Sequence, residues 1–153
     1  MTPIDWAIRP LLNYANWTGR ATRAEFWWFT LFSTILGIVF RIIDAVIGIP
    51  FIGNMGFVTL VGSLFLFIPS LMVTIRRLHD VNRTGRELIV PVIMLVCSPL
   101  VFMFGSFLGQ IVQLGYAGLT LIMFGQLLLL LTRKGSIVPN RYGACPTALS
   151  FGR

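Results

Sequence analysis

The residues best suited to chemistry in this chain are His79 and Asp80, which lie next to each other among arginines. A histidine close to a carboxylate can act as a general base. Adjacent residues on a helix do not face each other, so a helix continuing through this pair would separate the two side chains. The sequence contains no recognisable nucleophile motif, glycine-rich phosphate loop or paired carboxylates. Two cysteines and one histidine supply no metal-ligand cluster, and no motif calls for a cofactor. We therefore assign no catalytic residue and lean towards a protein that is not an enzyme, with a lipid-headgroup-modifying enzyme as the least favoured alternative.

A second polar pair, Arg41 and Asp44, interrupts an otherwise apolar stretch. Residues three apart lie on one face of a helix, so these two opposite charges can pair. Charged groups inside a membrane are rare and often functional, which makes a small transporter or channel component an alternative function for this chain. We favour a self-neutralised pair, with Arg41 extending its side chain towards the nearby outer interface.

These side chains must be held by apolar helices, because the composition excludes a soluble domain. Of the 153 residues, 56% are hydrophobic and only 11% are charged, whereas soluble domains have roughly 25% charged residues. Residues 45–75 and 88–132 carry no charge at all. The second of these stretches would extend about 68 Å as one helix, about twice the thickness of a hydrocarbon core. It must therefore fold back, and Gly109 and Gln110 are the expected place.

The predicted fold is all-α: one integral membrane domain, residues 1–153, with four transmembrane helices and cytoplasmic N and C termini. The expected spans are 27–47, 57–75, 88–108 and 112–132, and the remaining segments are the N-terminal cytoplasmic or interfacial segment 1–25, the loop 76–87 and the tail 133–153. Eleven of the twelve basic residues lie in those three non-spanning segments. The positive-inside rule then puts all three segments in the cytoplasm.

Two of the helix starts share the pattern Thr-x-x-Glu. Thr22 and Glu25 precede the first span, and Thr84 and Glu87 precede the third. In a capping box the threonine hydroxyl accepts from the glutamate backbone N–H, and the glutamate side chain accepts from the threonine backbone N–H. The sequence therefore predicts a capping box at both places.

Three separated motifs, together with a shorter one, give the chain a family resemblance. They are Gly-Arg-Ala-Thr-Arg-Ala-Glu-Phe-Trp-Trp at 19–28, Pro-Ser-Leu at 69–71, Arg-Arg-Leu-His-Asp at 76–80 and Pro-Asn-Arg-Tyr-Gly at 139–143. In this order they resemble the small bacterial inner-membrane proteins grouped as domain of unknown function 805 (DUF805). The resemblance covers about residues 14–146 and implies a multi-pass protein of the bacterial inner membrane, without an established activity. Residues 81–87 depart from the family, because the tryptophans usual in this loop are missing.

The resemblance also points to a polar cluster where the three cytoplasmic segments meet. Its members would be Arg20, Glu25, Arg76, Arg77, His79, Asp80, Asn140, Arg141 and Tyr142. The planar fork of arginine suits phosphate oxygens, so this cluster could bind anionic lipid headgroups of the bilayer. A protein partner or a second copy of the chain is an alternative occupant, and nucleic acid is not expected. The cluster could equally be only a structural lock between the loops.

Overall fold

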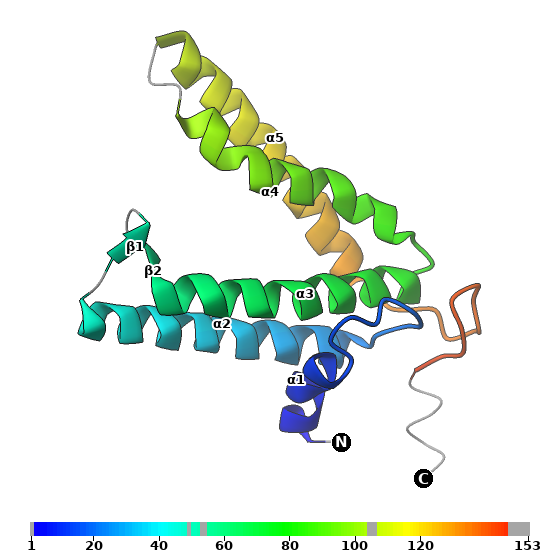
Figure 1. Ribbon diagram of the computed structural model, residues 1–153. Helices are drawn as coiled ribbons and strands as arrows, with labels where there is room; N and C mark the ends of the chain where they lie inside the picture. Colours follow the sequence, from blue (N-terminus) through cyan, green and yellow to red (C-terminus); the bar gives the residue numbers. More distant parts are fainter. Residues whose placement is uncertain (1, 49, 53–54, 104–106, 147–153) are drawn as a thin grey trace.

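A computed structural model describes residues 2–48, 50–52, 55–103 and 107–146, and within them the chain is built almost entirely from helices (Figure 1). The elements in order are α1 (Pro3–Leu12), α2 (Arg23–Ile47), β1 (Pro50–Ile52), β2 (Met55–Gly56), α3 (Phe57–Asp80), the 3₁₀ helix η1 (Gly85–Leu88), α4 (Ile89–Phe102) and α5 (Phe107–Thr132). The last residues of the predicted tail, 147–153, lie outside the described residues.

Three of these helices are long and apolar enough to cross a membrane. They are α2, α3 and the part of α5 from Gly109 to Thr132. All three match expected spans, although α3 continues five residues past the predicted end at Ile75. Their outward-facing side chains are large and apolar, as expected for contact with lipid; Val46 and Leu121 are examples.

The third expected span, 88–108, is shorter in the structure than predicted. α4 has 14 residues, which extend about 21 Å at 1.5 Å per residue. It ends at Phe102 and α5 begins at Phe107, so the chain reverses before the predicted turn. Gly109 and Gln110 lie inside α5 because a single glycine is readily tolerated in a membrane helix.

The turn between α2 and α3 contains a short antiparallel pair of strands that the sequence did not predict. Pro50 pairs with Gly56, and Ile52 with Met55. α2 ends just before this turn at Gly48, which has a left-handed φ of 71°, and the Gly48 N–H donates to the Asp44 carbonyl. A glycine is the usual residue at this helix-ending position because it has no Cβ.

The helices form two antiparallel hairpins, α2–α3 and α4–α5, which meet near the termini and diverge towards the opposite end (Figure 1). The core lies where they meet. It contains Ala21, Phe26, Phe29, Val73, Leu78, Leu88, Leu127 and Leu131. Contributions come from α2, α3, η1 and α5, so this one cluster fastens the two hairpins to each other.

Helix α1 packs against the start of α2 and crosses its direction (Figure 1). Thr2 and Asp5 form a full capping box at its start, and the hydrogen bonds from Thr2 lower the pKa of Asp5. Ala7 and Pro10 are buried, whereas Ile4 and Leu12 are exposed on another face. A short helix with one free apolar face is typical of an element lying in the membrane interface.

The two predicted capping boxes have different outcomes. At the start of α2 only half of the predicted box forms: the Glu25 N–H donates to the Thr22 hydroxyl at 3.1 Å, whereas the Glu25 carboxylate pairs with Arg76. The prediction of a capping box at Thr84 was wrong, since the Thr84 side chain makes no capping hydrogen bond. The Glu87 N–H donates instead to the Thr84 backbone carbonyl at 3.2 Å, the three-residue bond of a 3₁₀ turn, so the hydroxyl is not needed there.

Candidate functional site

Asp80, the last residue of α3, is the centre of a buried group of charges. The Arg20 Nε donates to Asp80 Oδ1 at 2.9 Å, and Arg20 Nη2 lies 2.8 Å from the same oxygen. Arg77 Nη1 donates to the second oxygen, Asp80 Oδ2. Gly135 lies against this carboxylate so closely that a Cβ there would be 1.8 Å from Asp80 Oδ2. One carboxylate therefore joins the segment before α2, the end of α3 and the segment after α5.

Arg77 connects α3 to the end of α5. Its Nε donates to the Leu131 carbonyl at 3.0 Å, and its Nη2 donates to the Arg133 carbonyl. The last carbonyls of a helix have no partner within the helix, so a buried cation here satisfies them and complements the helix dipole. The Arg77 side chain is 0% exposed.

Arg20 holds the tail in a similar way. Its Nη1 donates to the Val138 carbonyl at 3.1 Å and to the Gly143 carbonyl at 3.4 Å. Its Nη2 donates to the Ser136 carbonyl. The Arg20 guanidinium is therefore occupied by backbone oxygens of the tail as well as by Asp80.

A second buried ion pair, Glu25 with Arg76, lies between α2 and α3. Glu25 Oε1 is 2.8 Å from Arg76 Nη1, and Arg9 from α1 approaches Glu25 Oε2 at 4.0 Å. The Arg76 carbonyl also accepts from the Ala21 N–H at 3.0 Å. Arg76 Nε and Nη2 are buried without a hydrogen-bond partner among the described residues. We name the five residues Arg20, Glu25, Arg76, Arg77 and Asp80 the polar clamp.

His79 is held in contacts between loops, separate from those of Asp80. Its ring stacks on Tyr142 with centroids 3.8 Å apart and planes 4° from parallel, and its Nδ1 is 3.2 Å from the Gly19 carbonyl. Asn140 Nδ2 donates to the His79 carbonyl at 2.9 Å. Arg141 lies over the Tyr142 ring and donates through Nη2 to the Asn82 carbonyl. The structure thus brings all nine residues of the expected cluster to one end of the molecule, and it engages His79 and Asp80 with different partners.

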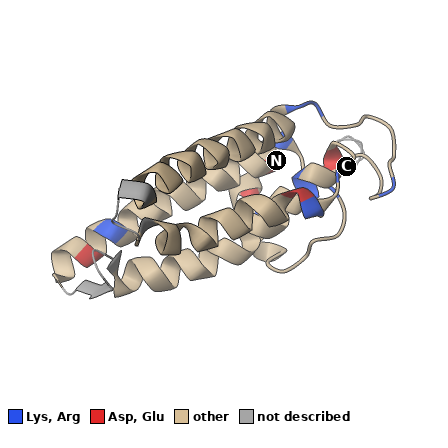
Figure 2. Cartoon of the chain, turned by 90° about the horizontal axis from the view of Figure 1, so that it is seen from above, with Lys and Arg blue, Asp and Glu red and all other residues tan. Residues whose placement is uncertain are grey.

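Six cations around the polar clamp are exposed. Arg83 pairs with Glu87 and Arg141 lies over the Tyr142 ring, which leaves Arg23, Arg86, Arg133 and Lys134. The ion pairs between described residues involve none of them. We name these four residues the basic rim. Figure 2 shows blue segments gathered at the end that holds both termini. Sequence reasoning placed these residues in the cytoplasmic segments, and none except Arg23 lies in a family motif. The signal that could have singled them out was the surplus of cations over acids in those segments.

Arg41 and Asp44 lie in the last turns of α2, at the end of the helix far from α1 and the polar clamp (Figure 1). Asp44 accepts from the backbone N–H groups of Val58, at 3.0 Å, and Thr59, at 2.7 Å, and so caps the start of α3. The ion pairs between described residues do not include Arg41. The expected pairing of these two charges is therefore absent, because the free N–H groups of α3 compete for the carboxylate and need an acceptor.

Comparisons with known proteins agree with the motifs. A family described as "Protein of unknown function (DUF805)" matches residues 14–144. The inner membrane proteins YhaI and YhaH of Escherichia coli K12 are each 35% identical over 82 residues, which is 54% of this chain. The aligned part covers 66% of YhaI and 68% of YhaH, so the match spans about two thirds of these relatives. No solved structure matches the chain.

Proposed function

From the premise that this chain belongs to the DUF805 family and is a multi-pass membrane protein, we propose that it binds anionic lipid headgroups through the basic rim. The protein acts in the bacterial inner membrane without catalysing a reaction. The polar clamp shapes the surface that carries the rim.

The chain crosses the membrane four times, with both termini in the cytoplasm. α3 and α5 both end at the polar clamp, as the bonds of Arg77 to Asp80 and Leu131 indicate. α5 is long enough to span, so its start lies on the far side. The chain must therefore cross between the end of α3 and the start of α5, and α4 is the helix available for that crossing. The basic end faces the cytoplasm because positive segments are retained there.

The observation that carries the proposal is the uneven use of charge at this end. The described residues supply ten basic side chains here and four acidic ones, Asp5, Glu25, Asp80 and Glu87, which leaves a surplus of six positive charges. Two of the carboxylates are buried in the polar clamp, and Glu87 pairs with Arg83 at 3.5 Å. The basic rim is left with its charge unneutralised at headgroup depth. Each such cation contributes about 1 kcal/mol of attraction to an anionic leaflet.

The polar clamp is better suited to hold loops than to bind a ligand. The three nitrogens of Arg77 all donate to acceptors within the chain, and so do those of Arg20. To reach Arg20 or Arg77, a lipid phosphate would have to displace these bonds, and to reach the two unpartnered nitrogens of Arg76 it would have to enter a buried site. Of the two roles expected for the cluster, we therefore propose that the polar clamp only holds the loops together. Headgroup binding is assigned to the basic rim.

The two alternative functions have less support. A channel or transporter site needs Asp44 free to bind or pair, yet its carboxylate is committed to the start of α3. A dyad needs His79 and Asp80 to act on one substrate, yet their side chains are engaged with separate partners.

The proposal is tested by measuring which phospholipids remain with the purified protein. In membranes of phosphatidylethanolamine and phosphatidylglycerol, we expect the wild type to enrich phosphatidylglycerol, as quantified by mass spectrometry. Replacing all four rim residues by glutamine should remove this enrichment, whereas Arg41→Gln at the other end should keep it. A fluorescent reporter fused to the C-terminus checks that orientation is unchanged. Equal enrichment in the rim variant and the wild type would overturn the proposal.

A further inference from the structure

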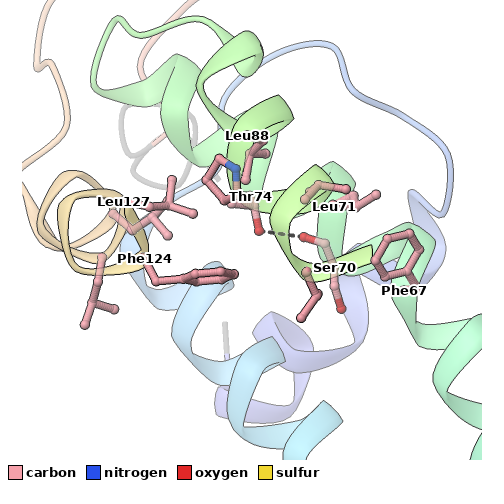
Figure 3. A pocket seen from close by; sticks show the side chains of 12 residues that line it. Phe67, Ser70, Leu71, Thr74, Leu88, Phe124 and Leu127 are labelled. Atoms are coloured by element: carbon pink, nitrogen blue, oxygen red, sulfur yellow. Dashed lines mark hydrogen bonds between the residues drawn. The ribbon is translucent and has the colours of Figure 1, made fainter. Parts of the chain in front are cut away.

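An apolar crevice lies between the two hairpins, walled by α3, α4 and α5 (Figure 3). It has a volume of about 320 Å³, within the range of small-molecule sites in proteins. Leu71 from α3, Val92 and Leu95 from α4, and Leu127 and Leu128 from α5 are among the residues that line it. α3 and α5 are long enough to cross the membrane, and α4 crosses it in the proposed four-span arrangement. The crevice then opens towards lipid and not towards water.

The polar groups in the crevice do not offer a site for a polar ligand. The Ser70 hydroxyl donates to the Leu66 carbonyl at 2.7 Å, and the Thr74 hydroxyl donates to the Ser70 carbonyl at 2.6 Å (Figure 3). Both hydroxyl protons are thus used within α3. The remaining surface is hydrocarbon, so the matching occupant is an alkyl chain.

The crevice extends from the level of the polar clamp along α4 and α5 towards the middle of the membrane. Leu88 and Leu131 line the end of the crevice nearest the clamp and also belong to the core beneath the clamp. Leu95 and Phe124, seven residues away along α4 and α5, line its deeper end. Seven helical residues extend about 10 Å, which is most of one hydrocarbon leaflet of about 15 Å. The crevice therefore has the depth of the cytoplasmic leaflet.

Three cations of the basic rim are close in the chain to the residues that line the clamp end of the crevice. Arg86 precedes Leu88 by two residues, and Arg133 and Lys134 follow Leu131 closely. Arg86 also lines a second hollow of about 200 Å³, which shares Pro91 and Leu127 with the crevice. An apolar slot with unneutralised cations at its headgroup end is complementary to an anionic amphiphile.

We propose that this crevice holds an acyl chain of one anionic phospholipid from the cytoplasmic leaflet, with its phosphate beside Arg86, Arg133 and Lys134. This inference rests on the proposed function, because the headgroup site is part of the basic rim. It adds a defined lipid site to the general attraction between the rim and the leaflet. A retained lipid then bridges the two hairpins where the protein itself leaves them apart.

Native mass spectrometry of the protein released from phosphatidylglycerol and phosphatidylethanolamine membranes tests the site directly. Val92→Trp fills the crevice from α4, and Ile93→Trp, at a position 54% exposed outside the crevice, is its matched control. We expect Val92→Trp to lower the occupancy of retained phosphatidylglycerol by about tenfold, equivalent to lost contact with about two methylene groups. The control should retain the lipid as the wild type does.

A second pair of variants repeats the test from α5, in case Val92→Trp does not fold. Leu128→Trp enters the crevice, and Leu129→Trp, at a position 66% exposed, stays outside it. The double variant Arg86→Gln with Lys134→Gln should lose the preference for phosphatidylglycerol while keeping a lipid of either class.

The outcomes separate this inference from the proposed function. If both crevice variants retain phosphatidylglycerol like their controls, the crevice site is wrong, while rim-dependent enrichment can still hold. If the wild type shows no preference for phosphatidylglycerol, both proposals fail. If the crevice variants convert a dimer into a monomer without losing lipid, a second copy occupies the crevice and the lipid site is overturned.

Discussion

Asp80→Asn is the sharpest test of the polar clamp, because it changes charge with almost no change in shape. The carboxylate accepts from Arg20 through one oxygen and from Arg77 through the other. In the variant, an amide group replaces one of these oxygens and presents N–H donors to an arginine, or else both arginines must move. The buried guanidinium groups of Arg20 and Arg77 then lose the negative charge that both of them contact. Breaking a buried pair by removing one partner costs about 3–5 kcal/mol, which is the loss of unfolding free energy that we expect.

The effect should be concentrated in the segments that the clamp holds. Arg20 binds the tail carbonyls of Val138 and Gly143 while it is fixed by Asp80, so the tail should detach before the helices unfold. Limited trypsin digestion in detergent follows this through cleavage after Arg141. Denaturant titration monitored by tryptophan fluorescence gives the total loss of stability.

Glu87→Gln is the matched control for this experiment. It also removes one carboxylate, but from an exposed pair with Arg83 at 3.5 Å. Exposed pairs contribute about 0–1 kcal/mol, so stability and tail protection should stay near the wild type. A loss below about 1 kcal/mol for Asp80→Asn, with a protected tail, would refute the clamp as the lock between the segments.

Two further substitutions probe close contacts. Gly135→Ala places a Cβ 1.8 Å from Asp80 Oδ2, so it should lower the unfolding free energy by about 1–3 kcal/mol and speed tail proteolysis, whereas Gly125→Ala, with open space around it, should change neither. If both alanine variants behave alike, the close packing of the tail on Asp80 is wrong. Asp44→Ala removes the acceptor at the start of α3 and should cost about 1 kcal/mol. Hydrogen exchange should accelerate at the first amides of α3 alone; unchanged protection there would contradict the cap.

The apolar runs were sufficient to predict where the first two long helices lie. They did not predict how far α3 continues into the charged residues that follow its apolar run. The predicted span 57–75 stops at the first arginine, whereas α3 continues to Asp80. A hydropathy pattern treats Arg76 and Arg77 as groups that need water. In the structure both are buried: Asp80 and backbone carbonyls at the end of α5 replace the water around Arg77, and Glu25 pairs with one nitrogen of Arg76.

The uninterrupted apolar run 88–132 contained little information about its own turn. Every position in it is apolar or uncharged, so hydropathy alone could not show that α4 ends at Phe102 and α5 begins at Phe107. The spacing of Arg41 and Asp44 likewise allowed a local pair. It could not reveal that the carboxylate would meet the start of α3, 14 and 15 residues further along the chain.

The membership of the candidate site was predictable, but its bonding was not. Family motifs named Arg20, Arg77 and Asp80 together, and all three meet in the structure. Their remaining partners are backbone carbonyls, such as Leu131 and Val138, which lie 54 residues from Arg77 and 118 residues from Arg20. A carbonyl exists at every residue and leaves no trace in the sequence, so the difference between a ligand site and an internal lock required coordinates.

The reach of Arg20 has a consequence for biosynthesis. Its acceptors at Val138 and Gly143 leave the ribosome only after α2, α3, α4 and α5 have been made. Translation proceeds at about 5–20 residues per second, so Arg20, Arg77 and Asp80 wait several seconds for their final partners. During that interval the α2–α3 hairpin can already form from neighbouring segments, while its junction with α4–α5 stays open. Synthesis of residues 136–143 is thus the event that fastens the newly inserted hairpins to each other.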